Sequence, residues 1–199
     1  MLHPHTELKF VSPEIGYGIF ATTLIPKGTI TWVKDELDRI IPEEDLSQMT
    51  AANLENLMKY SYRNSRGNYV FCWDLTRYVN HSYKPNSMLT ALGFEIAIRD
   101  ILPGEEMTND YGTLNILESF ECANGPSHER DRVCPDDLAR FHNVWNEQIN
   151  SAFAFISDHT QPLNKFLTSQ QLQEISLIFT GQKIMPSILN NLHKAYNLA

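Results

Sequence analysis

The sequence predicts an α+β fold, with short β-strands in its first half and helices in its second. Two observations lead to this prediction. Between residues 15 and 112, short runs of β-branched and aromatic residues are separated by Gly and Pro turns, a pattern typical of strands joined by tight turns. From residue 135 onward, apolar residues recur every three or four positions, which is the period of an amphipathic helix.

Strands are expected in the first half at residues 15–22, 29–33, 66–74, 93–101 and 107–112. The segments 66–74 and 93–101 are expected to pair, with Phe94, Ile96 and Ile98 on one face. Residues 42–62 differ, because their apolar side chains have mostly helical spacing and their acidic residues lie near the start, where the helix dipole favours negative charge. This segment predicts one broken helix or two short ones.

Three further helices are expected in the second half, at residues 136–159, 168–181 and 186–196. The second has a Thr or Ser cap and a terminal glycine, and the third begins with a proline in its first turn. The apolar faces of these helices are expected to pack on the β core, since core packing is the commoner use of such faces.

The composition of the 199-residue chain restricts its partners and its location. A net charge of −8 argues against a nucleic-acid surface, which needs clustered Lys and Arg, and favours a basic partner. The sequence shows neither a signal peptide nor an apolar run long enough to span a bilayer, so the interpretation is a soluble, cytoplasmic protein with no membrane contact. The three cysteines are too few for a disulfide framework, which agrees with a reducing compartment.

One short motif, RYVNHSYKPNS at residues 77–87, places Asn80 and His81 directly after an apolar pair. Taken alone, this motif is most simply a tight loop, because Asn side chains readily bond their own backbone. The other two motifs, GYGIFAT at 16–22 and IRDILPGEEMTNDYG at 98–112, are also common in turns when each is taken alone.

Read together and in this order, the three stretches resemble the signatures of the SET-domain protein lysine methyltransferases. The resemblance covers residues 1–120, with a helical insert at about 42–62, and leaves 121–199 as a post-SET segment and C-terminal helices. The stretch DELDRIIPEEDL and the helix after it are also similar to small stand-alone bacterial SET proteins.

The resemblance implies a SET-type fold of small curved β-sheets, in which the segments around His81 and Tyr111 are threaded together as a pseudoknot. It also implies that S-adenosylmethionine is the cofactor and methyl donor, and that Tyr111 is the catalytic tyrosine. The residues implied to bind the cofactor are Gly16, Tyr17, Gly18, Asn80, His81, Tyr111 and Phe120.

Methyl transfer to a lysine needs a neutral amine aligned with the methyl group, so positioning contributes much of the acceleration. An apolar, aromatic channel would desolvate the lysine and lower its pKa. Five aromatic residues are candidates for either this channel or the core, and for each of them the core is the more common role: Tyr60, Tyr62, Tyr69, Phe71 and Trp73. The expected substrate is a lysine-containing, basic protein.

The sequence departs from the family pattern at several positions. Tyr83 stands where many SET proteins have a zinc-binding cysteine, and Cys122, His128 and Cys134 are three loosely spaced donors where a structural zinc needs four. No metal is therefore expected. Asn109 stands where an aromatic residue is usual, two positions before Tyr111.

Two other functions remain open. The first is a catalytically silent SET-like module that binds a basic protein through the same groove. The second is a hydrolase that uses His81 with Ser82 or Asp110, which is less favoured because the sequence has no nucleophile elbow. The oligomeric state is not predicted.

Overall fold

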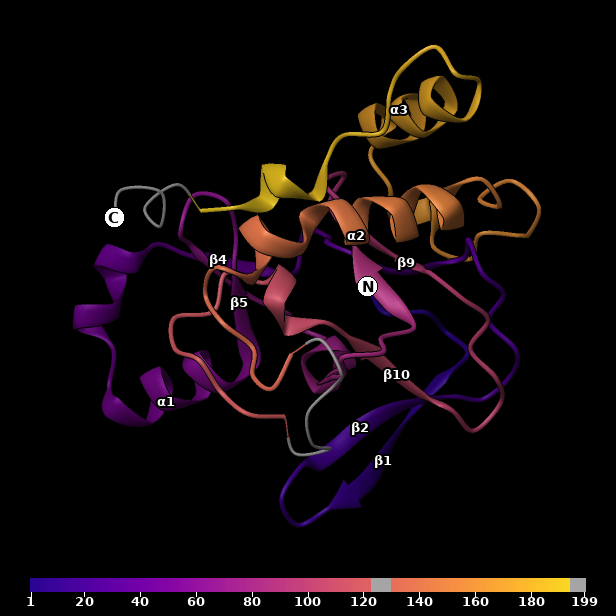
Figure 1. Ribbon diagram of the computed structural model, residues 1–199. Coiled ribbons are helices and arrows are strands. Elements are labelled where there is room, and N and C mark those ends of the chain that lie inside the picture. The colour runs from indigo at the N-terminus through magenta and orange to yellow at the C-terminus, as the bar shows by residue number, and fades with distance from the viewer. Residues whose placement is uncertain (123–129, 194–199) are drawn as a thin grey trace.

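Three small β-sheets form the centre of the computed structural model, which describes residues 1–122 and 130–193 (Figure 1). The first sheet has four strands in the order β1-β2-β10-β7. These strands are β1 (Thr6–Ser12), β2 (Gly16–Ala21), β10 (Glu106–Asn109) and β7 (Asn80–His81). The second sheet is β3 (Ile30–Val33), β9 (Phe94–Ala97) and β8 (Ser87–Leu89), in that order. The third is β4 (Arg39–Ile41), β6 (Tyr69–Phe71) and β5 (Ser61–Arg63).

Within the first sheet, β7 and β10 pair in parallel, with Asn80 opposite Thr108 and His81 opposite Asn109. The strand β10 also pairs antiparallel with β2, where Met107 lies opposite Ile19. Three segments that are far apart in the sequence are thus brought into one sheet. The set of small sheets confirms the predicted fold class, and the parallel pairing is consistent with the pseudoknot, whose threading stays a prediction.

The expected pairing of 66–74 with 93–101 is wrong. The strand β6 lies between β4 and β5, and β9 lies between β3 and β8. Apolar alternation placed Phe94 and Ile96 correctly in the core. The opposite face of β9 is also buried, however, because Glu95 is only 6% exposed. Periodicity cannot show this, since it marks an apolar face and not what covers the other one.

The helical insert consists of two short helices, which is one of the two predicted alternatives. The 3₁₀ helix η1 (Glu43–Gln48) is followed by α1 (Ala51–Tyr60). Between them Met49 and Thr50 are extended, and the Thr50 side chain accepts a hydrogen bond from the Asn53 N–H as an N-cap.

Two of the three predicted C-terminal helices are confirmed. They are α2 (Asp137–Phe153) and α3 (Ser169–Phe179), the latter begun by a capping box between Thr168 and Gln171. The helix α2 ends earlier than residue 159, because the chain turns after Phe153 and brings Ile156 into the core beside Leu163.

The third predicted helix, at 186–196, is wrong in its extent. Only a 3₁₀ turn, η5 (Ile188–Asn191), forms there, and residues 194–196 lie outside the described residues. Side chains from elsewhere accept backbone N–H groups near both ends of this segment. The Asn146 Oδ1 accepts from the Ile188 N–H at 2.9 Å, and the Asn115 Oδ1 accepts from the His193 N–H at 2.9 Å.

The largest core cluster joins the β3-β9-β8 sheet to α2, which crosses the sheet near β9 in Figure 1. In it Phe94 and Ile96 pack with Ala152 and Phe153. The C-terminal helices therefore pack on the β core as predicted. Among the described residues, none of the helices combines the length and apolar character needed to cross a membrane.

Candidate functional site

A cluster of five residues lies where β2, β7 and β10 meet, and we call it the glycine–asparagine cluster: Gly16, Tyr17, Gly18, Asn80 and Glu106. The Asn80 Nδ2 donates to the Tyr17 carbonyl at 3.0 Å and to the Glu106 Oε1 at 2.7 Å. A Cβ added at Gly18 would meet the Glu106 carboxylate and would lie 3.0 Å from the Asn80 Nδ2. Gly18 therefore leaves room for a close approach that any other residue would block.

The free polar atoms of this cluster are hydrogen-bond acceptors, which suit the ammonium group of a ligand. Both amide hydrogens of Asn80 are already donated, which leaves its Oδ1 to accept from a ligand ammonium. The Glu106 carboxylate beside it adds a negative charge. Gly16, at φ +85°, has no atom within 4 Å of an added Cβ, so the turn before Gly18 is open.

His81 is buried next to this cluster, and its ring is neutral. Its Nδ1 accepts a hydrogen bond from the Tyr111 N–H at 3.1 Å, so the ring proton is on Nε2. That Nε2 is buried and has no hydrogen-bond partner within the described part of the chain. Burial, and then the charge of Arg130, lower the pKa of His81 to about 4. A buried N–H of this kind is suited to a polar ligand.

Tyr111 follows β10 and connects several of the predicted site residues. Its hydroxyl donates to the Val79 carbonyl at 2.7 Å, and its ring centroid lies 5.6 Å from that of His81. Phe120 is also 5.6 Å from His81. Burial raises the pKa of Tyr111 above its ordinary value, so the hydroxyl stays protonated.

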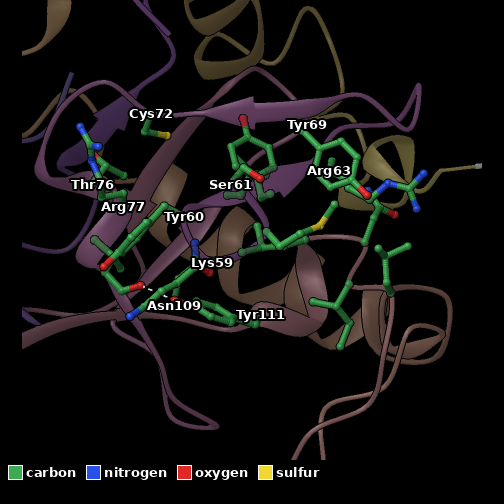
Figure 2. Close-up of a pocket in the computed structure, with 18 of the residues that line it drawn as sticks. Lys59, Tyr60, Ser61, Arg63, Tyr69, Cys72, Thr76, Arg77, Asn109 and Tyr111 are labelled. Carbon is green, nitrogen blue, oxygen red and sulfur yellow. Dashed lines mark hydrogen bonds between the residues drawn. The ribbon is translucent and has the colours of Figure 1, made fainter. Parts of the chain in front are cut away.

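A cavity of about 490 Å³ opens beside Tyr111 (Figure 2). In Figure 2, Tyr60, Asn109 and Tyr111 lie toward one end and Tyr69 and Arg63 toward the other. Of the seven predicted cofactor-binding residues, only Tyr111 and Phe120 line the cavity. The residues Gly16–Gly18, Asn80 and His81 lie outside its lining, so Tyr111 is where the two parts of the site meet.

Three of the five candidate aromatics line this cavity: Tyr60, Tyr62 and Tyr69. Phe71 and Trp73 do not. Tyr62 and Tyr69 also pack against core clusters, so they serve both roles. Trp32, which follows the Lys-Gly-Thr turn, is a further lining aromatic.

Three charged residues of the site were missed by sequence reasoning: Glu95, Glu106 and Arg130. Glu95 stands in an otherwise apolar strand, and this is the one signal that could have revealed it. Glu106 looked like part of an ordinary hairpin turn. Arg130 has no sequence signal, because its partners come from distant segments.

Arg130 links the turn before Tyr111 to the start of α2. Its guanidinium pairs with Asp110 and, at 2.8 Å, with Asp137 at the start of α2. It also lies 4.9 Å from the Tyr83 ring centroid and 5.0 Å from that of Phe141. Burial raises the pKa of Asp110, and Arg130 opposes this effect. The arginine thus stacks on the residue that stands where many SET proteins have cysteine.

The arrangement gives little support to the hydrolase. The Ser82 hydroxyl accepts from the Lys84 N–H, and the Asp110 carboxylate pairs with Arg130. A nucleophile partnered to His81 would require Nε2 to accept a proton, but that atom already carries one.

Among the candidate metal donors, His128 lies outside the described residues. Cys134 lies close to Asp136 and Asp137, but an oxygen of Asp137 already accepts from Arg130 and from the Cys134 N–H. The expectation of no metal stays a prediction.

The family model for the SET domain matches residues 16–112. A search of curated proteins found no match. The class defined by the fold and the family match is that of the SET-domain proteins, and residues 16–112 of this chain form a SET domain. SET domains are commonly protein lysine methyltransferases, and those enzymes generally use S-adenosylmethionine.

Proposed function

We propose that the protein is an S-adenosylmethionine-dependent methyltransferase whose substrate is the side-chain amine of a protein lysine. The observation that supports it most is the position of Tyr111, whose backbone N–H donates to His81, which lies outside the cavity lining, and which lines the cavity together with Val79. Cofactor and substrate sites that meet at one residue are what a direct transfer between two bound molecules requires.

In this proposal, Asn80 and Glu106 hold the charged amino-acid end of the cofactor, the Gly16–Gly18 loop lies along it, and Phe120 covers it. S-adenosylmethionine, when bound, supplies a methyl group on a sulfonium. The Tyr111 hydroxyl and the Val79 carbonyl form a polar rim that favours an electron-poor methyl group by weak C–H···O contacts.

The cavity would take the lysine side chain. Its apolar and aromatic lining, including Trp32, Tyr62 and Leu89, removes water from the amine and so lowers the amine pKa. The lining also includes three basic residues, Lys59, Arg63 and Arg77. The charge of the cavity lining therefore does not itself support a basic substrate. The support for a basic substrate comes from the net charge of the whole chain, which is −8.

Calorimetric titration with S-adenosylmethionine, followed by methyl transfer to poly-L-lysine, tests the proposal. We expect binding and transfer. Binding without transfer to poly-L-lysine or to any lysine-rich protein would favour the silent binding module. Failure to bind S-adenosylmethionine would remove the proposed function.

A further inference from the structure

Glu95 lies in the lining of the cavity, on the face of β9 opposite to Phe94 and Ile96. Its strand neighbours across the sheet are Trp32 on β3 and Leu89 on β8. Both are buried and apolar, and both line the same cavity. A carboxyl group in this setting costs free energy unless something polar compensates it.

Two neutral donors bind the carboxylate. The Asn109 Nδ2 donates to one oxygen at 2.6 Å, and the Ser87 hydroxyl donates to the other at 3.1 Å. Each oxygen can accept a further hydrogen bond. Asn109 is held in turn, because its Oδ1 accepts from the Asp110 N–H at 2.7 Å. The carboxylate is therefore fixed in place with unused acceptor capacity.

No Lys or Arg side chain pairs with this carboxylate within residues 1–122 and 130–193, although Lys59, Arg63 and Arg77 line the same cavity. Of these, Arg63 pairs with Glu43, and Arg77 donates to backbone carbonyls. The N-terminal ammonium, which pairs with Asp35 at 3.1 Å, is the smallest of the influences on the pKa of Glu95. Buried carboxylates are normally paired, so a lone one that lines a cavity indicates a site for a cation.

We propose that Glu95 is a catalytic residue that receives the ammonium group of the substrate lysine in the cavity and accepts its proton. The inference rests on the proposed function. The N–H bond of the ammonium breaks, its proton forms an O–H bond on Glu95, and the amine keeps the lone pair that attack on a methyl group requires. After the product leaves, the carboxyl group loses the proton to water that enters the open cavity.

Burial in the cavity reduces the free-energy cost of this proton transfer. Burial raises the pKa of Glu95 to about 7, although the bonds from Ser87 and Asn109 oppose the effect. Desolvation in the same cavity lowers the pKa of a lysine amine. The two pKa values therefore approach one another, and proton transfer between groups of matched pKa is nearly balanced.

The first test does not depend on methyl transfer. Glutamate carboxyl carbons labelled with ¹³C are titrated by NMR, with and without n-butylammonium, which mimics the end of a lysine side chain. We expect one carboxyl with a midpoint near 7, which n-butylammonium lowers and neutral 1-pentanol does not. In Ser87→Ala this midpoint should rise, which identifies the signal even if Glu95→Gln fails to fold. A midpoint unmoved by n-butylammonium would overturn the inference.

The second test uses single-turnover transfer to poly-L-lysine with saturating S-adenosylmethionine. Glu95→Gln should lower the rate near neutral pH by about 100-fold, the lower end of what a positioned base contributes, and the rate should recover as pH rises. Affinity for S-adenosylmethionine should not change. Glu55→Gln, the same substitution on the exposed side of α1, should match wild type.

These arms separate the two proposals. If wild type neither binds S-adenosylmethionine nor transfers a methyl group, the proposed function fails, and the NMR titration still decides whether Glu95 receives an ammonium. If wild type is active and Glu95→Gln keeps both its rate and its pH profile, Glu95 is a structural residue and the inference fails alone.

Discussion

The cavity lined by Tyr111 and the glycine–asparagine cluster beside His81 differ in how completely the protein pairs their polar groups. In the cluster, Asn80 is bonded on both amide hydrogens. In the cavity, Glu95 has no cationic partner, and Trp32 Nε1 has no hydrogen-bond partner in the described ranges.

This difference indicates that the two parts of the site are prepared to different degrees. The cluster is organised before any ligand arrives, so little is reorganised on binding. In the cavity, the described residues provide no cation for Glu95 and no acceptor for the Trp32 N–H, and a polar ligand end would supply such partners.

The largest effect expected from this comparison is on stability. Between the ordinary pKa of 4.5 and the folded value of about 7, the native state holds a proton on Glu95 that the unfolded state has lost. Stability therefore falls as pH rises through this window, by about 3 kcal/mol at about 1.4 kcal/mol per pKa unit. Glu95→Gln should lack this loss, as measured by urea unfolding near pH 5 and near pH 8.

Other titrating groups, such as His3 and His81, are present in both proteins, so the difference between variant and wild type isolates Glu95. An identical pH dependence in the two would mean that the carboxyl is solvated and that the comparison is wrong.

The second effect concerns the cluster. Asn80→Ala should weaken S-adenosylmethionine binding by roughly 1–3 kcal/mol, because it leaves polar partners unpaired. Calorimetry measures the change, and Asn143→Ala on the exposed surface of α2 is the matched control. Unchanged affinity in a folded Asn80→Ala protein would remove Asn80 from the cofactor site.

The third effect concerns the place where the two parts meet. Tyr111→Phe removes the hydroxyl that bonds to Val79, so single-turnover transfer should fall tenfold or more, a loss of about 1.4 kcal/mol or greater. Cofactor affinity should largely persist. Equal rates would show that Tyr111 is only a core residue.

The smallest effect is on product distribution. Asn109 is smaller than the usual aromatic residue and lines the cavity, so products beyond monomethyl-lysine are expected. Asn109→Tyr should shift them toward fewer methyl groups while cofactor binding remains. Mass spectrometry after exhaustive turnover measures this, and a wild type that stops at one methyl group would show that other residues close the space.

Local patterns predicted five of the ten strands in the described residues and two of the three C-terminal helices, because propensity and periodicity act over a few residues. The strands β1, β4, β5, β7 and β8 were missed. The resemblance predicted which distant motifs share a site, and the structure places Asn80, His81 and Tyr111 together. Glu95 and the pairing of β9 were missed for one reason. What covers the second face of a strand depends on segments that sequence patterns cannot place.

Arg130 has a consequence for how the chain folds. It lies beyond the matched residues 16–112, but it neutralises Asp110, which is 1% exposed and precedes Tyr111. Replacing Arg130 by alanine would leave that carboxylate buried and uncompensated, which costs several kcal/mol. The helical region therefore belongs to the same cooperative folding unit as the turn that carries Tyr111. Arg130 acts as an internal counter-ion for Asp110, and the turn needs this counter-ion to stay ordered.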